Sequence, residues 1–326
     1  MSKTPSLNRL IPMSSKKLKI PAKFIFKIAL GIFAIGQVGW IFLDFYHLTH
    51  DNSSAQSKIS IRNANHSDVF SLDRFGRPIS REEVQISSGN YISGKKYFMT
   101  IGISTIERKK DGKRYSYLSR TLNSLISKMP TAAKMEVVIV ILCANRDSDA
   151  NQRTYKELQN TFHELIVKGF LQVIVAPERF YRSLENLPKT FNDSSLRMKW
   201  RSKQSLDYAF LLYYCHGLGE YHLQIEDDVD IEAGYYEKLK SDIVTTKVPW
   251  AIYQYYKMGF IGKLFKSQYL QLIANIFRIY YFEMPLDLLY IQPFILSNLK
   301  NRQKIASKFL FHHIGKQSSS QNSDIY

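Results

Sequence analysis

A short apolar run ends in three consecutive carboxylates within Tyr221 to Asp230, which reads YHLQIEDDVD. The carboxylates are Glu226, Asp227 and Asp228, and their oxygens are the hard ligands that Mg²⁺ and Mn²⁺ prefer. A β-strand that delivers such a cluster to the end of an α/β sheet can hold a divalent cation against a nucleotide diphosphate. A solvated acidic turn is the alternative, because short acidic clusters are common on protein surfaces.

The elements around this cluster predict a sheet that places it at a ligand-binding edge. Four apolar runs are typical of buried parallel strands and alternate with segments of helical length near residues 115–128, 151–168 and 200–216. The four runs are Tyr97 to Thr105, Glu136 to Ala144, Leu171 to Ala176 and Tyr221 to Ile225. The sequence therefore predicts an α/β domain with a mostly parallel sheet, in which ligands bind beyond the carboxyl ends of the strands. The acidic triplet falls at one of these ends, which favours the metal-site interpretation.

No glycine-rich phosphate loop accompanies these strands. The segment after the first strand reads ERKKDGKRYSYL and contains neither GxGxxG nor GxxxxGK[ST]. A cation must then neutralise the phosphates, and one or two carboxylates of the triplet suffice to hold Mg²⁺ or Mn²⁺. Such a cation also acts as a Lewis acid for a departing nucleoside diphosphate.

Positive charge gathers at the N-terminus of the chain. The 326 residues carry 45 Lys and Arg against 28 Asp and Glu, and seven of the basic residues fall within residues 1–27. No helix-turn-helix, zinc-finger or RNP-type motif accompanies this surplus, so no nucleic-acid partner is expected. Residues 24–43, FIFKIALGIFAIGQVGWIFL, predict a single transmembrane helix that anchors the protein in a membrane, with a cleaved signal peptide as the alternative. The positive-inside rule makes residues 1–23 a cytosolic basic tail and places the rest in the lumen.

A luminal chain could carry N-linked glycans. Three sequons provide candidate glycosylation sites at Asn52, Asn65 and Asn192. The first two fall in residues 44–96, a stretch with many Ser and Asn residues that predicts a luminal stem. Cys143 falls within an apolar strand-like run and Cys215 at the end of a helical one, so two buried free thiols are expected rather than a disulfide. No metal-type Cys/His spacing surrounds them.

Five motifs in order carry a family resemblance. They are MKWRSKQSLDYAFLLYY (Met198 to Tyr214), YHLQIEDDV (from Tyr221), MGFIGKLF (Met258 to Phe265), EMPLDLL (Glu283 to Leu289) and FLFHHIGKQSS (Phe309 to Ser319). With these motifs the chain resembles the N-acetylglucosaminyltransferase IV family. The resemblance implies a Golgi type II membrane protein with a GT-A fold, which adds GlcNAc from UDP-GlcNAc to the α1,3-mannose arm of N-glycans. It implies a GT-A-like glycosyltransferase domain at residues 97–316, followed by a polar tail at residues 317–326.

The resemblance assigns roles residue by residue. Asp228 matches the family's metal position, and His313 matches a histidine that completes the metal or diphosphate site in many GT-A enzymes. A histidine in an apolar segment is also commonly a structural residue. The residues expected at the nucleotide are Thr105, Arg108, Asp147, Arg201, Lys203, Glu226 and Asp227. Lys203 also suits an intrahelical ion pair with Asp207, four residues further on.

Several positions depart from the family pattern. Gln254 stands at a glutamate position, and an amide cannot take the proton of an attacking hydroxyl. Asp287 remains as the candidate catalytic base, whereas Leu288 and Ile291 stand at a tryptophan position and a second aspartate position. The family continues into a C-terminal lectin-like domain, and this chain is expected to be a divergent short member that lacks it.

Two hypotheses follow. The first is an inverting GlcNAc-transferase of N-glycan branching, which uses UDP-GlcNAc and Mn²⁺ or Mg²⁺ on an N-glycan or glycoprotein acceptor. The second is a catalytically inactive homologue that associates with other Golgi glycosyltransferases and modulates them. Gln254 and the missing lectin-like domain favour the second, and the intact acidic triplet with His313 favours the first.

Overall fold

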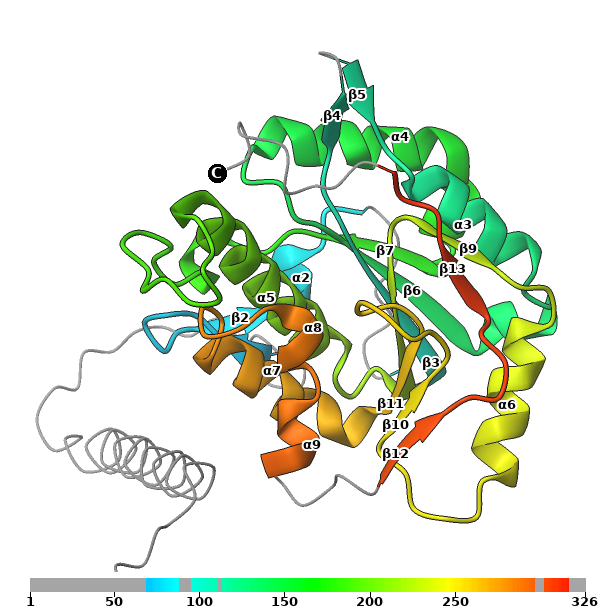
Figure 1. Ribbon diagram of the computed structural model, residues 1–326. Coiled ribbons are helices and arrows are strands. Elements are labelled where there is room, and N and C mark those ends of the chain that lie inside the picture. Colours follow the sequence, from blue (N-terminus) through cyan, green and yellow to red (C-terminus); the bar gives the residue numbers. More distant parts are fainter. Residues whose placement is uncertain (1–68, 88–94, 111–112, 297–301, 317–326) are drawn as a thin grey trace, which may run out of the picture. The chain divides into compact units, whose positions relative to one another are not determined.

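The described part of the chain forms an α/β fold around a seven-stranded sheet (Figure 1). The computed structural model describes residues 69–87, 95–110, 113–296 and 302–316. In spatial order the strands of the sheet are β12 (Gln303–Ile305), β10 (Ile252–Gln254), β11 (Lys263–Lys266), β8 (Gly219–Glu226), β3 (Tyr97–Thr105), β6 (Val137–Cys143) and β7 (Leu171–Ile174). The expected basic tail at 1–23 and the polar tail at 317–326 lie outside these ranges, as does the expected stem except for residues 69–87, 95 and 96.

The four apolar runs form four neighbouring strands, from β8 at the centre of the sheet to β7 at one edge, as the sequence predicts. Strands β8, β3, β6 and β7 are neighbours and run parallel. Every residue of β6 is buried, which agrees with a strand covered on both faces. In the register of β3 and β8, Ser104 lies beside Glu226, so both strands end at the same edge. The acidic triplet therefore follows the carboxyl end of a central strand.

The mostly parallel sheet expected from the sequence was wrong. The sheet is mixed rather than mostly parallel, because β11 runs antiparallel to both β8 and β10. Strands β10, β11 and β12 have only three or four residues and contain Gln and Lys, so they have no long apolar run to mark them. In the ranges that the structure describes, no helix is long and apolar enough to cross a membrane. Residues 24–43, for which a transmembrane helix was expected, lie outside those ranges.

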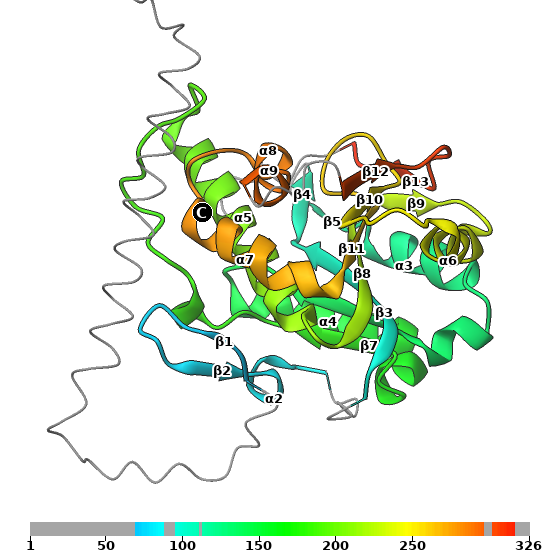
Figure 2. The ribbon, with the colours of Figure 1, turned by 90° about the horizontal axis from the view of Figure 1, so that it is seen from below.

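Helices cover both faces of the sheet (Figure 2). One core packs the sheet against α3 (Leu118–Ser127), α4 (Ser148–Val167) and α6 (Tyr235–Thr245). The other packs it against α5 (Ser195–Cys215) and α7 (Leu270–Ile279). From Ser205 to Cys215 every residue of α5 is buried, because the sheet covers one side of this helix and α7 lies against it. Cys143 and Cys215 are both buried free thiols, as expected.

Shorter elements complete the fold. They are the hairpin of β1 (Val69–Leu72) and β2 (Pro78–Ser80), α2 (Arg81–Val84), the hairpin of β4 (Arg108–Lys110) and β5 (Lys113–Tyr115), α8 (Leu286–Leu289), α9 (Gln292–Leu296), and the pair β9 (Val229–Ile231) and β13 (Phe311–His313). The buried guanidinium of Arg81 donates hydrogen bonds to the carbonyls of Tyr214 and His216 at the C-terminal end of α5. The last carbonyls of a helix carry partial negative charge, so the arginine stabilises this end of it.

Candidate functional site

Two segments that are far apart in the sequence bring Glu226, Asp228 and His313 together. Glu226 is the last residue of β8, and Asp228 follows two residues later. Strand β13 pairs with β9 so that His313 lies opposite Val229, next to Asp228. The backbone N–H of Ile314 also donates a hydrogen bond to the carbonyl of Asp228 at 2.8 Å. The pairing of two three-residue strands thus positions the histidine at the acidic triplet.

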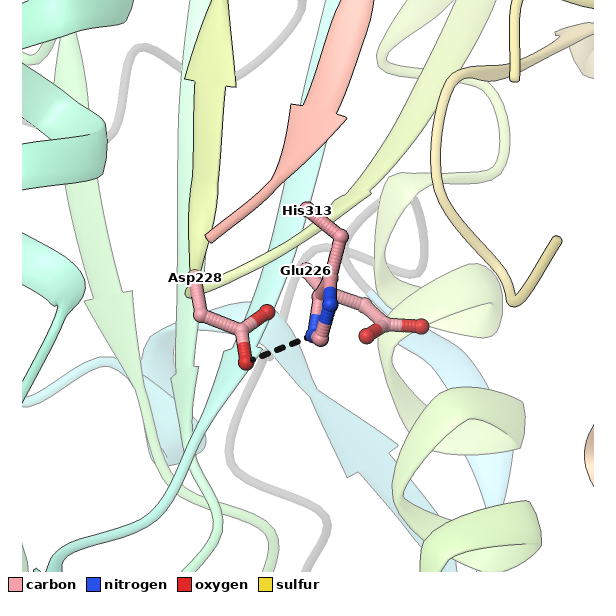
Figure 3. A group of neighbouring side chains, drawn as sticks. All are labelled: Glu226, Asp228 and His313. Carbon is pink, nitrogen blue, oxygen red and sulfur yellow. Dashed lines mark hydrogen bonds and ion pairs between the residues drawn. The ribbon is translucent and has the colours of Figure 1, made fainter. Parts of the chain in front are cut away.

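The side chains of these three residues form a cluster that can bind a cation. One ligand atom from each residue lies within 4.8 Å of the others, and Nε2 of His313 is 3.2 Å from Oδ2 of Asp228. In the view of Figure 3 the imidazole lies between the two carboxylates. The other oxygen of Asp228, Oδ1, is buried and has no hydrogen-bond partner among the described residues. A buried carboxylate oxygen without a partner is costly, and a cation at this cluster would satisfy it.

The electrostatics of the cluster also suit a cation. Burial, followed by the charge of Asp228, raises the pKa of Glu226 to about 8. Burial and the neighbouring Asp227 raise the pKa of Asp228 as well. Carboxylates crowded in this way repel one another, and a divalent cation reverses that penalty. Two carboxylates and an imidazole are a donor set that Mn²⁺ accepts, with positions left for phosphate oxygens and water.

Asp227, between the two clustered carboxylates, has a different environment. Its carboxylate accepts hydrogen bonds from the hydroxyl of Thr105 at 2.6 Å and from the guanidinium of Arg108 at 2.7 and 2.8 Å. All three side chains are buried. The sequence assigned these residues to the nucleotide, and the structure joins them to one another in the wall beside the cluster. They hold the end of β8 in place through a bidentate ion pair.

The cluster opens into a polar cavity of about 480 Å³. The loop after β3, helix α5, the segments 256–261 and 285–287, and the C-terminal segment 313–316 provide its walls. The predicted residues among those that line it are Thr105, Arg108, Arg201, Lys203, Glu226, Asp227, Asp228, Asp287 and His313. A cavity of this size and polarity suits a phosphorylated ligand of small-molecule size.

Asp287, the candidate base, lines this cavity from the first turn of α8. The carboxylate is exposed to the cavity, and partial burial raises its pKa, while the positive charge of Lys263 opposes that effect. The charge of Asp287 in turn contributes to the raised pKa of Glu226, which places the two carboxylates within electrostatic reach. A carboxylate is therefore present in the cavity to accept a proton.

Gln254, the most prominent departure from the family pattern, is not one of the described residues that line the cavity. It lies opposite Lys263 in the antiparallel pair β10 and β11. Its Oε1 accepts hydrogen bonds from the ammonium of Lys263 at 3.2 Å and from the hydroxyl of Tyr290 at 2.9 Å. The position supports a buried lysine in the sheet, so its amide says little about the presence of a catalytic base.

The basic residues of α5 are engaged within the protein. The ammonium of Lys203 donates to both carboxylate oxygens of Asp207 at 2.9 Å and to the carbonyl of Ala144. The guanidinium of Arg201 donates to Asp193 at 2.8 Å and to the hydroxyl of Thr190. Both side chains line the cavity but are almost fully buried. The intrahelical ion pair that the sequence offered as an alternative for Lys203 is present.

The remaining predicted residues lie away from the cavity. Asp147 caps the N-terminus of α4 by accepting a hydrogen bond from the N–H of Asp149, and it pairs with Arg153. Asn192 is exposed and has a positive φ of 58° in the segment before α5. The sequons at Asn52 and Asn65 lie outside the described residues.

Two glycines contribute to the cluster in a way that the sequence did not reveal. A Cβ at Gly315 would lie 2.1 Å from Oδ2 of Asp228, and a Cβ at Gly259 would lie 3.0 Å from Oε1 of Glu226. Gly259 also has a positive φ of 61°, which strains any larger residue. In the sequence these residues are only a glycine shortly after His313 and another in MGFIG. Neither pattern shows which side chain lies against the glycine in the fold.

The protein is an α/β domain with a cation-type cluster in the wall of a polar cavity, at the edge of the sheet where open α/β folds bind their ligands. The family model described as the MGAT4 conserved region matches residues 71–325 of the chain. The chain therefore belongs to this family, and the resemblance given by the five motifs is confirmed.

Two curated relatives agree with this assignment. Alpha-1,3-mannosyl-glycoprotein 4-beta-N-acetylglucosaminyltransferase A of Rattus norvegicus is 37% identical over 205 residues, which are 63% of this chain and 38% of that protein. The C enzyme of that name from Macaca fascicularis is 32% identical over 231 residues, which are 69% of this chain and 46% of that protein. The structure of S. aureus TarS 1–349 in complex with UDP-GlcNAc aligns with a TM-score of 0.35 and 13% identity, covering 69% of this chain and 61% of that chain. This chain spans less than half the length of the two curated relatives.

Proposed function

We propose that this protein is an N-acetylglucosaminyltransferase of N-glycan branching, which transfers GlcNAc from UDP-GlcNAc to the mannose core of an N-glycan. The observation that carries the proposal is the cluster of Glu226, Asp228 and His313 in the wall of a cavity that Asp287 also lines. Family membership and the names of the relatives support this choice of donor and acceptor. The proposed cofactor is Mn²⁺ or Mg²⁺ at the cluster.

In the proposed reaction an acceptor hydroxyl attacks C1 of GlcNAc from the side opposite the diphosphate. The new bond joins the hydroxyl oxygen to C1, the bond from C1 to the diphosphate oxygen breaks, and UDP leaves with the electron pair. Asp287 takes the proton of the hydroxyl, and its raised pKa strengthens it as a base. A cation held by Glu226, Asp228 and His313 would neutralise the charge that develops on the departing diphosphate. Thr105 and Arg108 orient the end of β8 by holding Asp227.

Transfer can be tested with the purified full chain, UDP-GlcNAc, Mn²⁺ and an N-glycan with a free core mannose arm. We expect transfer by the unmodified chain and a loss on the order of 10²-fold or more in kcat for Asp287→Asn, because the base is removed. Glu220→Gln provides the control, since it also replaces a carboxylate with an amide. Glu220 is exposed and lies at the end of β8 opposite to the acidic triplet.

The result also separates the two hypotheses. If the chain binds UDP with Mn²⁺ but transfers nothing to any core acceptor, the transferase proposal is wrong. The hypothesis of an inactive homologue that modulates other Golgi glycosyltransferases then takes its place. Transfer at the full rate by Asp287→Asn would instead remove Asp287 from the role of base and leave the transferase proposal intact.

The proposed location is the Golgi, with the described domain on the luminal side. The exposed side chain of Asn192 in an intact sequon supports it. If the domain is luminal, chain expressed in animal cells should lose mass on treatment with an N-glycosidase. The replacement Asn192→Gln should remove one glycan, and an untreated mass equal to that of the bare polypeptide would contradict the luminal location.

A further inference from the structure

Five lysine and arginine side chains of the described residues line the cavity, and they differ in whether a carboxylate of the protein pairs with them. They are Arg108, Arg197, Arg201, Lys203 and Lys316. Four of the five are paired with carboxylates of the protein. The ion pairs are Arg108 with Asp227 at 2.7 Å, Arg197 with Asp193 at 3.7 Å, Arg201 with Asp193 at 2.8 Å and Lys203 with Asp207 at 2.9 Å.

Lys316 is the exception. Its side chain is exposed, and it makes no ion pair or side-chain hydrogen bond with any residue in the described ranges. A lysine without a partner on an outer surface needs no explanation. Lys316, however, follows directly after Gly315, whose backbone approaches Asp228 so closely that a Cβ there would lie 2.1 Å from Oδ2. The backbone of Lys316 therefore follows directly after a contact with the cation-type cluster, and its unpaired side chain lines the same cavity.

The backbone of Lys316 is held in this place. Its N–H donates a hydrogen bond to the hydroxyl of Tyr117 at 2.8 Å. The ring of Tyr117 is buried, and the guanidinium carbon of Arg108 lies 5.4 Å from its centroid. Tyr117 precedes α3, and Arg108 is fixed by its bidentate pair with Asp227. The segment that carries Lys316 is thus tied to the same wall that holds the end of β8.

We propose that Lys316 binds the diphosphate of the sugar-nucleotide donor and stays with it as the nucleoside diphosphate leaves. This inference rests on the proposed function, and it names a residue to which neither the five motifs nor the metal cluster assigned a role. The negative charge of a diphosphate exceeds what one ammonium can neutralise, so the lysine complements a cation at the cluster rather than replacing it. Its flexible stem and compact charge suit a group that moves as the bond to the sugar breaks. Tyr117 is the positioning residue, since its hydroxyl fixes the backbone from which Lys316 extends.

Calorimetric titration of the purified full chain tests the proposal, with Mn²⁺ present and UDP or uridine as the ligand. We expect Lys316→Gln to weaken UDP binding about tenfold, because a charged hydrogen-bonding partner of the phosphates is lost. Uridine, which has no phosphate, should bind Lys316→Gln and the unmodified chain equally. Lys316→Arg should recover most of the loss, and Tyr117→Phe should weaken UDP binding by a smaller factor.

Lys308→Gln is the matched control, because it removes the same charge from an exposed lysine outside the cavity. Equal UDP affinity in Lys316→Gln and the unmodified chain would overturn the inference and leave the proposed donor standing. Equal weakening of uridine and UDP would also overturn it, since the effect would not then concern the phosphates. Absence of UDP binding by the unmodified chain would overturn both this inference and the proposed function.

Discussion

Replacing Gln254 with glutamate should stabilise the fold and leave the chemistry of the cavity almost unchanged. Gln254 lies opposite Lys263 in neighbouring strands, and side chains directly opposite in an antiparallel pair share one face of the sheet. Lys263 is fully buried, and its ammonium donates to two neutral oxygens, the amide of Gln254 and the carbonyl of Tyr256. No carboxylate in the described ranges accepts a hydrogen bond from it.

The magnitude follows from the pKa of Lys263. Burial lowers this pKa from 10.5 to about 8. Since one pKa unit corresponds to about 1.4 kcal/mol, carrying the charge inside the fold at pH 7 costs on the order of 3 kcal/mol. A glutamate would place a carboxylate oxygen near the position of the amide oxygen, 3.2 Å from Nζ. Desolvation of the new carboxylate offsets much of the attraction, so we expect a net gain of about 1 kcal/mol in the free energy of unfolding, or about 2–4 °C in Tm.

The pH dependence identifies the source of this gain. In the unmodified chain, the unfolded state keeps the lysine proton up to about pH 10.5, whereas the folded state loses it near pH 8. Stability therefore rises with pH between these two values. The carboxylate raises the folded-state pKa of Lys263, so the advantage of Gln254→Glu should be fully present below about pH 8 and disappear as the pH passes about 10.5.

Urea unfolding at pH 7 and pH 10.5 measures the difference between the two proteins. Gln268→Glu serves as the control, because it introduces the same charge at an exposed position. A gain as large at pH 10.5 as at pH 7, or no gain at all, would refute the role given to the buried lysine. Transfer of GlcNAc should be similar in both proteins. If Gln254→Glu transfers GlcNAc and the unmodified chain does not, residue 254 takes part in the reaction. That result would contradict the structural role given to Gln254.

Three further outcomes are expected. Gly315→Ala should abolish the rise in Tm that Mn²⁺ gives the unmodified chain. The added carbon would lie 2.1 Å from Oδ2 of Asp228 and 2.9 Å from Nε2 of His313. An unchanged rise in Tm would show that the cation binds elsewhere. Chelation by EDTA should stop GlcNAc transfer, and added Mn²⁺ should restore it. His222 is buried with a pKa lowered to about 4, so between pH 6.5 and 4 the unfolded state binds the extra proton and stability falls by up to about 3 kcal/mol. His222→Gln should flatten this slope in urea unfolding at pH 7, 6 and 5, and an identical slope would assign the loss to other groups.

Much of the sheet could be predicted from the sequence because its central strands are long and apolar. The run Tyr97 to Thr105 became β3 with the same bounds, and Glu226 fell at the end of β8 as expected. The antiparallel strand β11 begins with Lys263 and ends with Lys266, so no apolar pattern in the sequence predicted a strand there. The predicted sheet was mostly parallel for that reason, although the wrong orientation of one strand did not move the acidic triplet from the ligand-binding edge.

Proximity across the chain was harder to predict than chemistry. Asp228 and His313 are 85 residues apart, and the strands that join them have three residues each, too short for a periodic pattern. The motif supplied the histidine, and only the pairing of β9 with β13 shows why it reaches the carboxylate. Arg108 and Lys203 have the charges expected of phosphate ligands, yet both are paired with carboxylates of the protein. Helical spacing indicated Asp207 as the partner of Lys203, whereas no spacing rule indicated Asp227 as the partner of Arg108.

The same distinction decides how much weight Gln254 has. In the order of motifs it lies close to the acidic triplet, and a missing carboxylate there suggests lost catalysis. In space it supports Lys263 within the sheet, while Asp287 faces the cavity with a raised pKa and the cation-type cluster is intact. A substitution that changes the partner of a buried lysine acts on stability, whereas loss of the base would act on turnover. Activity should therefore depend on Asp287 rather than on Gln254, and the single substitution Asp287→Asn tests this.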